Sequence, residues 1–275
     1  MRVRVTELRV YPVKSMRGAA HERVQLSATG FEWDRQWMVI DAQGTFLTQR
    51  THPQLARVVP QIEGTVLKLE APGLAALCVP VAAQGAPVPV PVRVWNDACV
   101  GLDQGDVAAA WVSSALGQSV RLIRVAPEMG RLADAKWAGT TPAPLNFPDG
   151  YPLLIANQAS LDDLNTRLPQ PIPMERFRPN IVLEGLAAWA EDRIDTLTIG
   201  AVRLRLVKPC TRCTIPAVDQ RSGERSTDPT PALRQFRHSR QLHGVMFGEN
   251  GVILTGTGSE IERGAEVRVG YDAPA

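Results

Sequence analysis

Residues 207–219 read VKPCTRCTIPAVD, and they hold the most informative pair of residues in the chain, Cys210 and Cys213. The pair follows a strongly strand-like segment and precedes a turn that contains a proline. Two thiols three residues apart are typical of a site that binds a soft metal or carries out redox chemistry. The other two cysteines, Cys78 and Cys99, lie far upstream and have no such partner motif. We therefore look for the chemistry first at the end of this strand.

Strand-like segments lie on both sides of the motif and predict a mainly β protein. Residues 195–199 and 202–207 are expected to form a tight hairpin through Gly200-Ala201. Other expected strands are a bulged strand at 3–10, a hairpin of 37–41 and 45–49, an edge strand at 88–95, and strands at 151–156, 181–184, 251–254 and 266–269. The pattern predicts an α+β fold, mainly β, with two β-rich lobes.

Few segments have helical periodicity. Residues 106–116 predict a helix that Gly117 terminates. Its apolar face is expected to consist of Val107, Trp111 and Ala115. A capping-box-like sequence at Ser160 predicts the start of a short helix that ends near residue 168. Residues 126–150 predict a linker or long loop, and residues 219–234 predict a mobile or active-site loop.

Composition narrows the functional class. The 275 residues are 44% hydrophobic and 21% charged, which is ordinary for a globular protein of one large or two modest domains. A net charge of +2 argues against bulk binding of nucleic acid. No apolar run approaches the roughly 18 residues of a membrane span, and the N-terminus does not resemble an export signal. Four cysteines do not form a disulfide framework in a chain of this size, so we expect a cytoplasmic protein.

The cysteine pair alone allows several kinds of site. It is half of a zinc knuckle, which His238 and His243 would have to complete. It also fits a thioredoxin-like dithiol, although Thr214-Ile215-Pro216 does not resemble the start of a helix. A third possibility is a single thiolate ligand to a cofactor metal, with Lys208 and Arg212 lowering the pKa of the thiol and attracting an anion. Two buried structural cysteines are the remaining alternative.

Cationic and amide residues at predicted strand ends suggest an anionic ligand. Lys14 and Ser15 follow the first strand after a proline, where an ammonium, a hydroxyl and backbone N–H groups can meet a phosphate. Arg35 follows Asp34 at the start of another strand, and Arg178 precedes a third. Each of these residues is by itself more often a solvated charge or a turn residue. Their chemistry indicates a ligand only if the fold brings them together.

Four motifs together resemble one family. YPVKS (11–15), DRQWMVI (34–40), FRPNIVLEG (177–185) and PCTRCTIPAVDQRSG (209–223) look like signatures of molybdenum-cofactor-sulfurase C-terminal (MOSC) domain proteins. The chain most resembles the subgroup with an N-terminal MOSC β-barrel domain, which includes the amidoxime reducing component and its bacterial relatives. The resemblance spans about residues 1–270. It implies an N-terminal MOSC β-barrel-like domain at 1–125 and a MOSC domain at 130–275.

The resemblance also implies a cofactor and a set of residues that bind it. The cofactor is the molybdenum cofactor, and Cys213 matches the metal-ligating and catalytic cysteine. Cys210 is then an additional thiol. The residues that match cofactor-binding positions of the family are Lys14, Ser15, Arg35, Asn157, Gln158, Ser160, Arg178, Asn180, Thr211, Arg212 and Asn250. A soft thiolate suits the metal, and cations suit the terminal phosphate of the pterin.

The activity implied is reduction of N-hydroxylated compounds, a small-molecule substrate class. The alternative is a non-catalytic carrier of molybdenum cofactor or sulfur. Asp219 is a candidate for a supporting role beside the cofactor, although a loop Asp is more often a turn residue. The chain contains no dinucleotide fingerprint and no cysteine run for an iron–sulfur cluster. A reductase of this sequence therefore needs electrons from a separate ferredoxin-like or flavin protein. A candidate docking surface for it, or else a solvated face, contains Arg221, Arg225, Arg234, Arg237 and Arg240.

Overall fold

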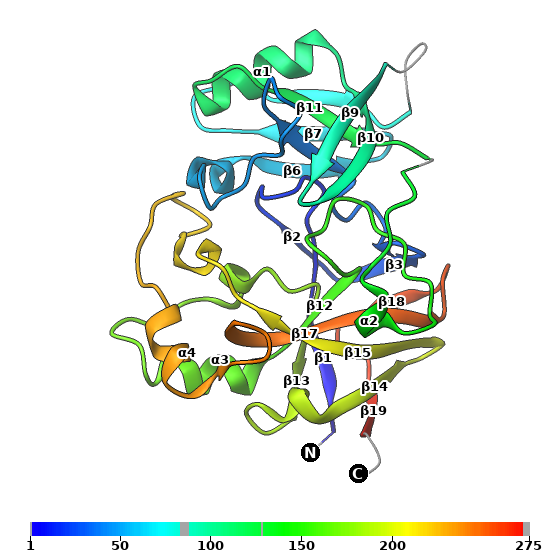
Figure 1. The fold of residues 1–275 in the computed structure, drawn as a ribbon, viewed down its shortest axis with the longest axis vertical. Coiled ribbons are helices and arrows are strands. Elements are labelled where there is room, and N and C mark those ends of the chain that lie inside the picture. The colour runs from blue at the N-terminus through cyan, green and yellow to red at the C-terminus, as the bar shows by residue number, and fades with distance from the viewer. Residues whose placement is uncertain (1, 83–87, 128, 272–275) are drawn as a thin grey trace.

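The computed structural model describes residues 2–82, 88–127 and 129–271, and Figure 1 shows them as two lobes stacked along the long axis. Within these residues the protein is mainly β, with 41% of residues in strands and 17% in helices. The predicted α+β, mainly β class is confirmed. No helix of the described residues is long and apolar enough to cross a bilayer.

One lobe is built on a large mixed sheet. In the described chain its strand order is β19-β14-β15-β17-β12-β13-β1-β2, and β16 pairs with β17. These strands are β1 Arg4–Val10, β2 Ala19–His21, β12 Leu153–Asn157, β13 Ile181–Glu184, β14 Ile194–Ile199, β15 Val202–Thr211, β16 His238–Ser239, β17 Gly244–Thr255 and β19 Val267–Tyr271. The pairing of β1 with β13 shifts register between Val5 and Glu7, as the predicted bulge requires. The first strand thus belongs to the same sheet as the cysteine motif.

A small sheet of β18 (Glu260–Glu262), β3 (Arg23–Ser27) and β4 (Gly30–Phe31) lies beside this lobe. Its inward side chains Val24, Leu26, Phe31 and Ile261 join one buried core with apolar residues of β1, β12, β13, β14 and β15. Because residues 4–31 pack into this core, the N-terminal segment is held against the C-terminal half by both backbone pairing and apolar burial.

The other lobe contains two sheets, ordered β5-β11-β10-β9 and β6-β7-β8 among the described residues. The strands are β5 Trp37–Ile40, β6 Val59–Glu63, β7 Val66–Glu70, β8 Leu77–Pro80, β9 Pro89–Val94, β10 Asp97–Asp103 and β11 Arg121–Val125, with a 3₁₀ turn η1 at Pro53–Arg57. β9 lies at the edge of its sheet, as its prolines predicted, because proline cannot donate a backbone hydrogen bond to a neighbouring strand. The expected partner of β5 at 45–49 is reduced to isolated bridges such as Ile40–Phe46.

Helix α1 (Asp106–Leu116) has the predicted bounds and ends at Gly117, whose φ of 68° is left-handed. The predicted apolar face is wrong at Val107, which is 75% exposed, whereas Trp111 and Ala115 are partly buried against the core. The core instead receives Ala108, Ala109, Val112 and Leu116. Apolar residues at helical spacing lie on both sides of this helix. Packing against β11 and β8 selects the side that is buried.

The expected linker at 126–150 is a packed segment and holds the short helix α2 (Ala135–Ala138). Leu145 and Phe147 are fully buried. Arg131, 7% exposed, donates to the carbonyl oxygens of Pro148 at 2.5 Å and Asp149 at 2.8 Å. Its side chain thus fixes the conformation of the segment just before β12.

The remaining helices differ from prediction at their ends. α3 (Gln158–Asn165) begins at the cap residue Asn157, whose side chain accepts from Ala159 N, so Ser160 does not start it. The expected loop at 219–234 is wrong over its last five residues, which belong to α4 (Thr230–Phe236). The other short turns are η2 Met174–Phe177, η3 Ala190–Arg193 and η4 Ile215–Ala217.

Candidate cofactor site

The segment after β1, the starts of β12 and β13, the end of β15 and the middle of β17 border one cavity of about 320 Å³ between the two lobes, which we call the cation cavity. Nine of the twelve predicted site residues line it: Lys14, Ser15, Arg35, Arg178, Asn180, Thr211, Arg212, Cys213 and Asn250. Residues up to 236 positions apart in sequence thus meet at one place, as a ligand-binding role requires.

The cysteine motif reaches the cavity at the end of β15. This strand pairs with β17, with Lys208 opposite Asn250, and it ends at Thr211. The chain then turns through η4, whose residue Ile215 is buried. Cys213 is half-buried at this turn, and Cys210 lies on the strand itself. The thiols therefore do not open a helix, as a thioredoxin-like site would require.

The cavity is strongly basic. Six of its lining side chains are cationic, Lys14, Arg35, Arg50, Arg178, Lys208 and Arg212, and Asp149 is its single acidic residue within the described part of the chain. Burial lowers the pKa of Lys14 to about 8, against the opposing effect of Asp149. Burial also lowers the pKa of Arg178 to about 10. This concentration of poorly solvated positive charge favours an anionic ligand.

Asp149 is held by two of these cations. Lys14 Nζ binds its Oδ1 and the carbonyl of Phe147, and Arg50 Nη2 donates to its Oδ2 at 2.8 Å. Desolvation by the surrounding protein opposes ionisation of Asp149, although its side chain is 52% exposed, but Lys14 and Arg50 hold the pKa of this carboxyl well below its usual range. Burial likewise opposes the charge on Arg50, and Asp149 and the Cys213 thiol outweigh it and raise the pKa of Arg50. Arg50 thus lies between the carboxylate and Cys213.

Tyr11 separates two of the arginines. The guanidinium carbons of Arg35 and Arg178 each lie 4.3 Å from the centre of its ring, and its hydroxyl donates to Pro179 O at 3.1 Å. Burial raises the pKa of Tyr11 to about 12, so the ring stays neutral. A Cβ at Gly18 would overlap this ring, which explains the glycine there.

Three residues of the cavity have left-handed backbone. Ser15, Arg35 and Arg178 have φ of 64°, 48° and 60°, and in the described residues only four other non-glycine residues have positive φ. Such conformations cost free energy in residues with a Cβ, and proteins retain them most often at functional sites.

Asn180 binds protein groups through both atoms of its amide. Its Oδ1 accepts from Arg35 Nη1 at 2.9 Å and Leu154 N at 3.1 Å, and its Nδ2 donates to Arg9 O at 3.2 Å. The buried Asp34 binds the same Arg35 guanidinium and accepts from Tyr11 N at 2.8 Å. Asn180 and Asp34 therefore orient Arg35 toward the cavity.

Cys210 has a different environment from Cys213. Arg212 Nη1 lies 2.9 Å from Cys210 Sγ, and its Nη2 donates to Phe177 O at 2.7 Å. Burial raises the pKa of the Cys210 thiol in spite of Arg212. Across the described residues no group of three or more His, Cys, Asp or Glu is close enough to hold a metal ion, which weighs against the zinc knuckle with His238 or His243.

Three predicted site residues do not line the cation cavity. Asn157 Nδ2 and Ser160 Oγ donate to the buried Glu191 Oε2 at 3.0 and 2.8 Å. Gln158 donates to Asp162 at 2.8 Å and lines a second cavity. They lie at the end of β12 and in the first turn of α3, outside the set of residues that line the cation cavity.

The matches with known proteins agree with this arrangement of motifs. The MOSC N-terminal beta barrel domain matches residues 2–119, and the MOSC domain matches residues 142–272. The mitochondrial amidoxime-reducing component 1 of Mus musculus is 31% identical over 97% of this chain and 80% of its own length. This chain belongs to the MOSC family.

Two further relatives extend the comparison. Mitochondrial amidoxime-reducing component 1 of Homo sapiens is 33% identical over 89% of this chain and 77% of its own length. The molybdenum cofactor sulfurase of Danio rerio is 29% identical over 88% of this chain, but the match covers only 31% of that protein. The MOSC chain described here therefore resembles both named enzymes along most of its length.

Four further lining residues of the cation cavity with charged or hydroxyl side chains were not predicted as site residues: Arg50, Asp149, Tyr151 and Lys208. Arg50 follows the expected hairpin, and Asp149 belongs to a PDG sequence that is typical of a turn. Neither has a distinctive motif. Lys208 was noted only as a neighbour of the thiols, and the alternation of β15 was the signal that could have placed it.

Unpartnered polar atoms test whether this MOSC site fits a molybdenum cofactor. Arg50 Nη1, Tyr151 Oη and Arg212 Nε are buried and have no hydrogen-bond partner among the described residues. All three are donors and belong to residues that line the cavity. An anionic ligand rich in acceptors would satisfy them, and a thiolate at Cys213 would suit a soft metal. The donor set therefore fits the cofactor.

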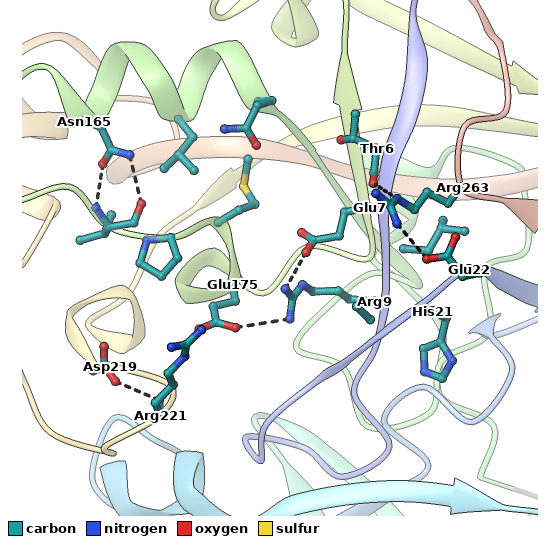
Figure 2. A pocket seen from close by; sticks show the side chains of 17 residues that line it. Thr6, Glu7, Arg9, His21, Glu22, Asn165, Glu175, Asp219, Arg221 and Arg263 are labelled. Atoms are coloured by element: carbon teal, nitrogen blue, oxygen red, sulfur yellow. Dashed lines mark hydrogen bonds and ion pairs between the residues drawn. The ribbon is translucent and has the colours of Figure 1, made fainter.

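A second cavity is larger, about 920 Å³, and lies between β1, β2, α3 and η2 (Figure 2). Its charges pair with one another, because Arg9 binds Glu7 at 2.5 Å and Glu175 at 3.4 Å, and Arg263 binds Glu22 at 2.8 Å. Asp219 lies here and not in the cation cavity. Size alone would select this cavity, but its chemistry resembles a solvated, internally neutralised surface.

Proposed function

We propose that this MOSC protein is a molybdenum-cofactor-dependent reductase of N-hydroxylated compounds, with Cys213 as the metal ligand. The observation that carries the proposal is the position of Cys213 in a cavity with six cationic side chains and three unpartnered donors. Relatives named amidoxime-reducing components support the substrate class.

Each group of residues has a separate role in the proposal. Lys14, Ser15 and Arg35 bind the phosphate of the cofactor, with Arg35 oriented by Asn180. Arg178 and Arg212 provide donors for the remaining polar edges. The bound cofactor supplies the two-electron redox chemistry. In the overall reaction the N–O bond breaks, two electrons and two protons are taken up, and the oxygen leaves as water while an N–H bond forms.

The electrons come from a separate redox protein in this proposal. Arg221, Arg225, Arg234 and Arg240 are exposed and suit an acidic partner. Arg237 is excluded from the predicted surface, because it is 8% exposed and binds both oxygens of Asp192. Reversing Arg221, Arg234 and Arg240 to Glu should slow turnover with a protein donor by about three- to tenfold at low salt, and should spare turnover with a small dye. Arg225 is left unchanged because it donates to the carbonyl of Arg50 at 2.6 Å. Arg203→Glu, which changes an exposed side chain of β15, is the matched control.

Steady turnover is the test of the reductase itself. Cofactor-loaded protein should reduce an N-hydroxylated amidine with an artificial electron donor, and Cys213→Ala should abolish this turnover. The competing function is a carrier of cofactor or sulfur, which the similarity to a molybdenum cofactor sulfurase supports. Cofactor-replete protein that turns over no N-hydroxylated substrate with any donor would favour the carrier.

A further inference from the structure

Trp95 occupies a strained and exposed position. It lies in the two-residue turn between β9 and β10, has a φ of 57°, and is 44% exposed. A glycine would adopt this backbone at lower cost, because a Cβ disfavours positive φ. The stability of the fold does not explain why a large aromatic residue occupies a strained and half-exposed position. Its ring is therefore expected to serve a function.

The ring of Trp95 lies against residues of the cation cavity. Arg50 is 4.7 Å from its centre, and Phe46 packs edge-on to it at 5.1 Å and 73°. Lys14 Nζ in turn lies 4.9 Å from the centre of the Phe46 ring. The two rings, which we call the aromatic wall, therefore flank the two cations that bind Asp149.

The aromatic wall is held rigidly. Asp97, which follows the turn, accepts from Arg131 Nε at 2.6 Å. Arg131 also binds the carbonyls of Pro148 and Asp149, so one side chain joins the β9–β10 turn to the segment that carries Asp149. A preorganised ring surface binds a flat ligand with a small loss of conformational entropy.

The wall borders the cation cavity through Lys14 and Arg50, which line the cavity and lie over the Phe46 and Trp95 rings. The cation cavity, at about 320 Å³, is near the lower limit of ligand pockets, roughly 300–1,000 Å³, so a bound cofactor leaves little room within it. Substrate contacts must then come from residues around the cavity beside Cys213. Arg50 connects the cation cavity with the aromatic wall, since it neighbours both Cys213 and the Trp95 ring.

We propose that Trp95 and Phe46 stack on the flat ring of aromatic N-hydroxylated substrates and so determine a preference for them over aliphatic ones. This inference rests on the proposed function. The free energy gained by each aromatic stacking pair is modest, and it favours substrate binding rather than cleavage of the N–O bond. The wall therefore sets KM and leaves kcat unchanged.

The experiment compares Trp95→Ala, Trp95→Phe and the control Val107→Ala, which changes an exposed residue on α1. KM and kcat are measured with an aryl and an alkyl N-hydroxylated amidine, using a dye as electron donor. Trp95→Ala should raise KM for the aryl substrate by about three- to tenfold, with kcat and the alkyl substrate unchanged, and Trp95→Phe should retain most of the preference. Calorimetry with the aryl amidine product on cofactor-loaded protein should show the same fold-loss of affinity.

Each other outcome would overturn the inference. An equal rise in KM for both substrates would give the ring a general binding role. A loss of bound cofactor would give it a structural role, and an effect confined to a protein donor would give it a docking role. If no substrate turns over, the proposed reductase function fails, and calorimetry still decides whether Trp95 binds aryl amidines.

Discussion

Neighbouring residues of β17 face two opposite electrostatic environments. Asn250 lines the cation cavity with its six basic side chains. Glu249 points the other way, as successive strand residues do, and is 4% exposed near Glu191, Asp192 and Arg237. One strand therefore separates a basic, ligand-accessible face from an acidic, enclosed one.

Both faces contain buried polar atoms without partners, and the comparison shows how differently these are accommodated. On the basic face they are the donors Arg50 Nη1, Tyr151 Oη and Arg212 Nε, which belong to residues that line a cavity. On the acidic face they include the carboxylate oxygens Glu249 Oε1 and Glu191 Oε1, together with the donor Arg237 Nε. A bound anion satisfies the first set, whereas protonation of Glu249 removes a buried charge from the second.

The largest expected effect comes from removing a cation from the basic face. Lys14→Ala or Arg35→Ala should weaken retention of the cofactor by about 1–3 kcal/mol each, or roughly 5- to 150-fold, because each loses a charged hydrogen bond to the phosphate. The pterin that remains bound after gel filtration measures this.

Arg221→Ala is the control, since Arg221 lines the second cavity in Figure 2. Its retention of cofactor should equal that of the parent protein. If Arg221→Ala releases as much pterin as Lys14→Ala, the distinction between the two cavities is wrong.

A smaller effect is expected on the acidic face. Burial, with added repulsion from Asp192 and Glu191, raises the pKa of Glu249 to about 9 from its ordinary 4.5. Between these values the folded protein binds a proton that the unfolded chain releases, so this residue's contribution to stability falls as the pH rises. Glu249→Gln keeps a neutral side chain, and it should gain stability over the parent by about 2 kcal/mol between pH 5 and pH 6.5, with the gap widening further toward pH 8.

Denaturant unfolding of both proteins across this pH range provides the measurement. Glu260→Gln, on exposed β18, should show no such divergence. A constant stability difference between Glu249→Gln and the parent from pH 5 to pH 8 would mean that Glu249 is ionised in the folded protein.

The elements that sequence predicted well are those whose signal is local. β13 and α1 have the predicted bounds, because a run of β-branched and apolar residues and a terminal glycine act over a few positions. The buried face of α1 and the packed segment at 126–150 were missed. The buried face of α1 depends on its contacts with β8 and β11, and the packing of 126–150 depends on the contacts of Arg131 with Asp97, Pro148 and Asp149.

The same distinction holds for the site. The residues within motifs, such as Lys14, Arg178 and Cys213, converge on one cavity. Arg50 and Asp149 belong to no recognisable motif. They lie beside Lys14 and Cys213 only because the two lobes pack together. Asn157 and Ser160 donate to Glu191 and do not line this cavity, and their contact with Glu191 depends on η3.

The smallest effect is expected at the other cysteine. Cys210 has a raised pKa through burial, and Arg212 lies beside it. Cys210→Ala should therefore retain molybdenum and lose less than about threefold in turnover, since a small packed thiol is replaced by a side chain of similar polarity. Metal content near zero in Cys210→Ala would instead make it a ligand.

The most direct test of the account is the molybdenum content per chain of protein made in a host supplied with molybdate. The parent protein should bind about one equivalent together with a releasable pterin, and Cys213→Ala should lose the metal while its unfolding transition is unchanged. Near-zero molybdenum and no pterin in the parent, or full molybdenum in folded Cys213→Ala, would contradict the assignment of Cys213 as the ligand in the cation cavity.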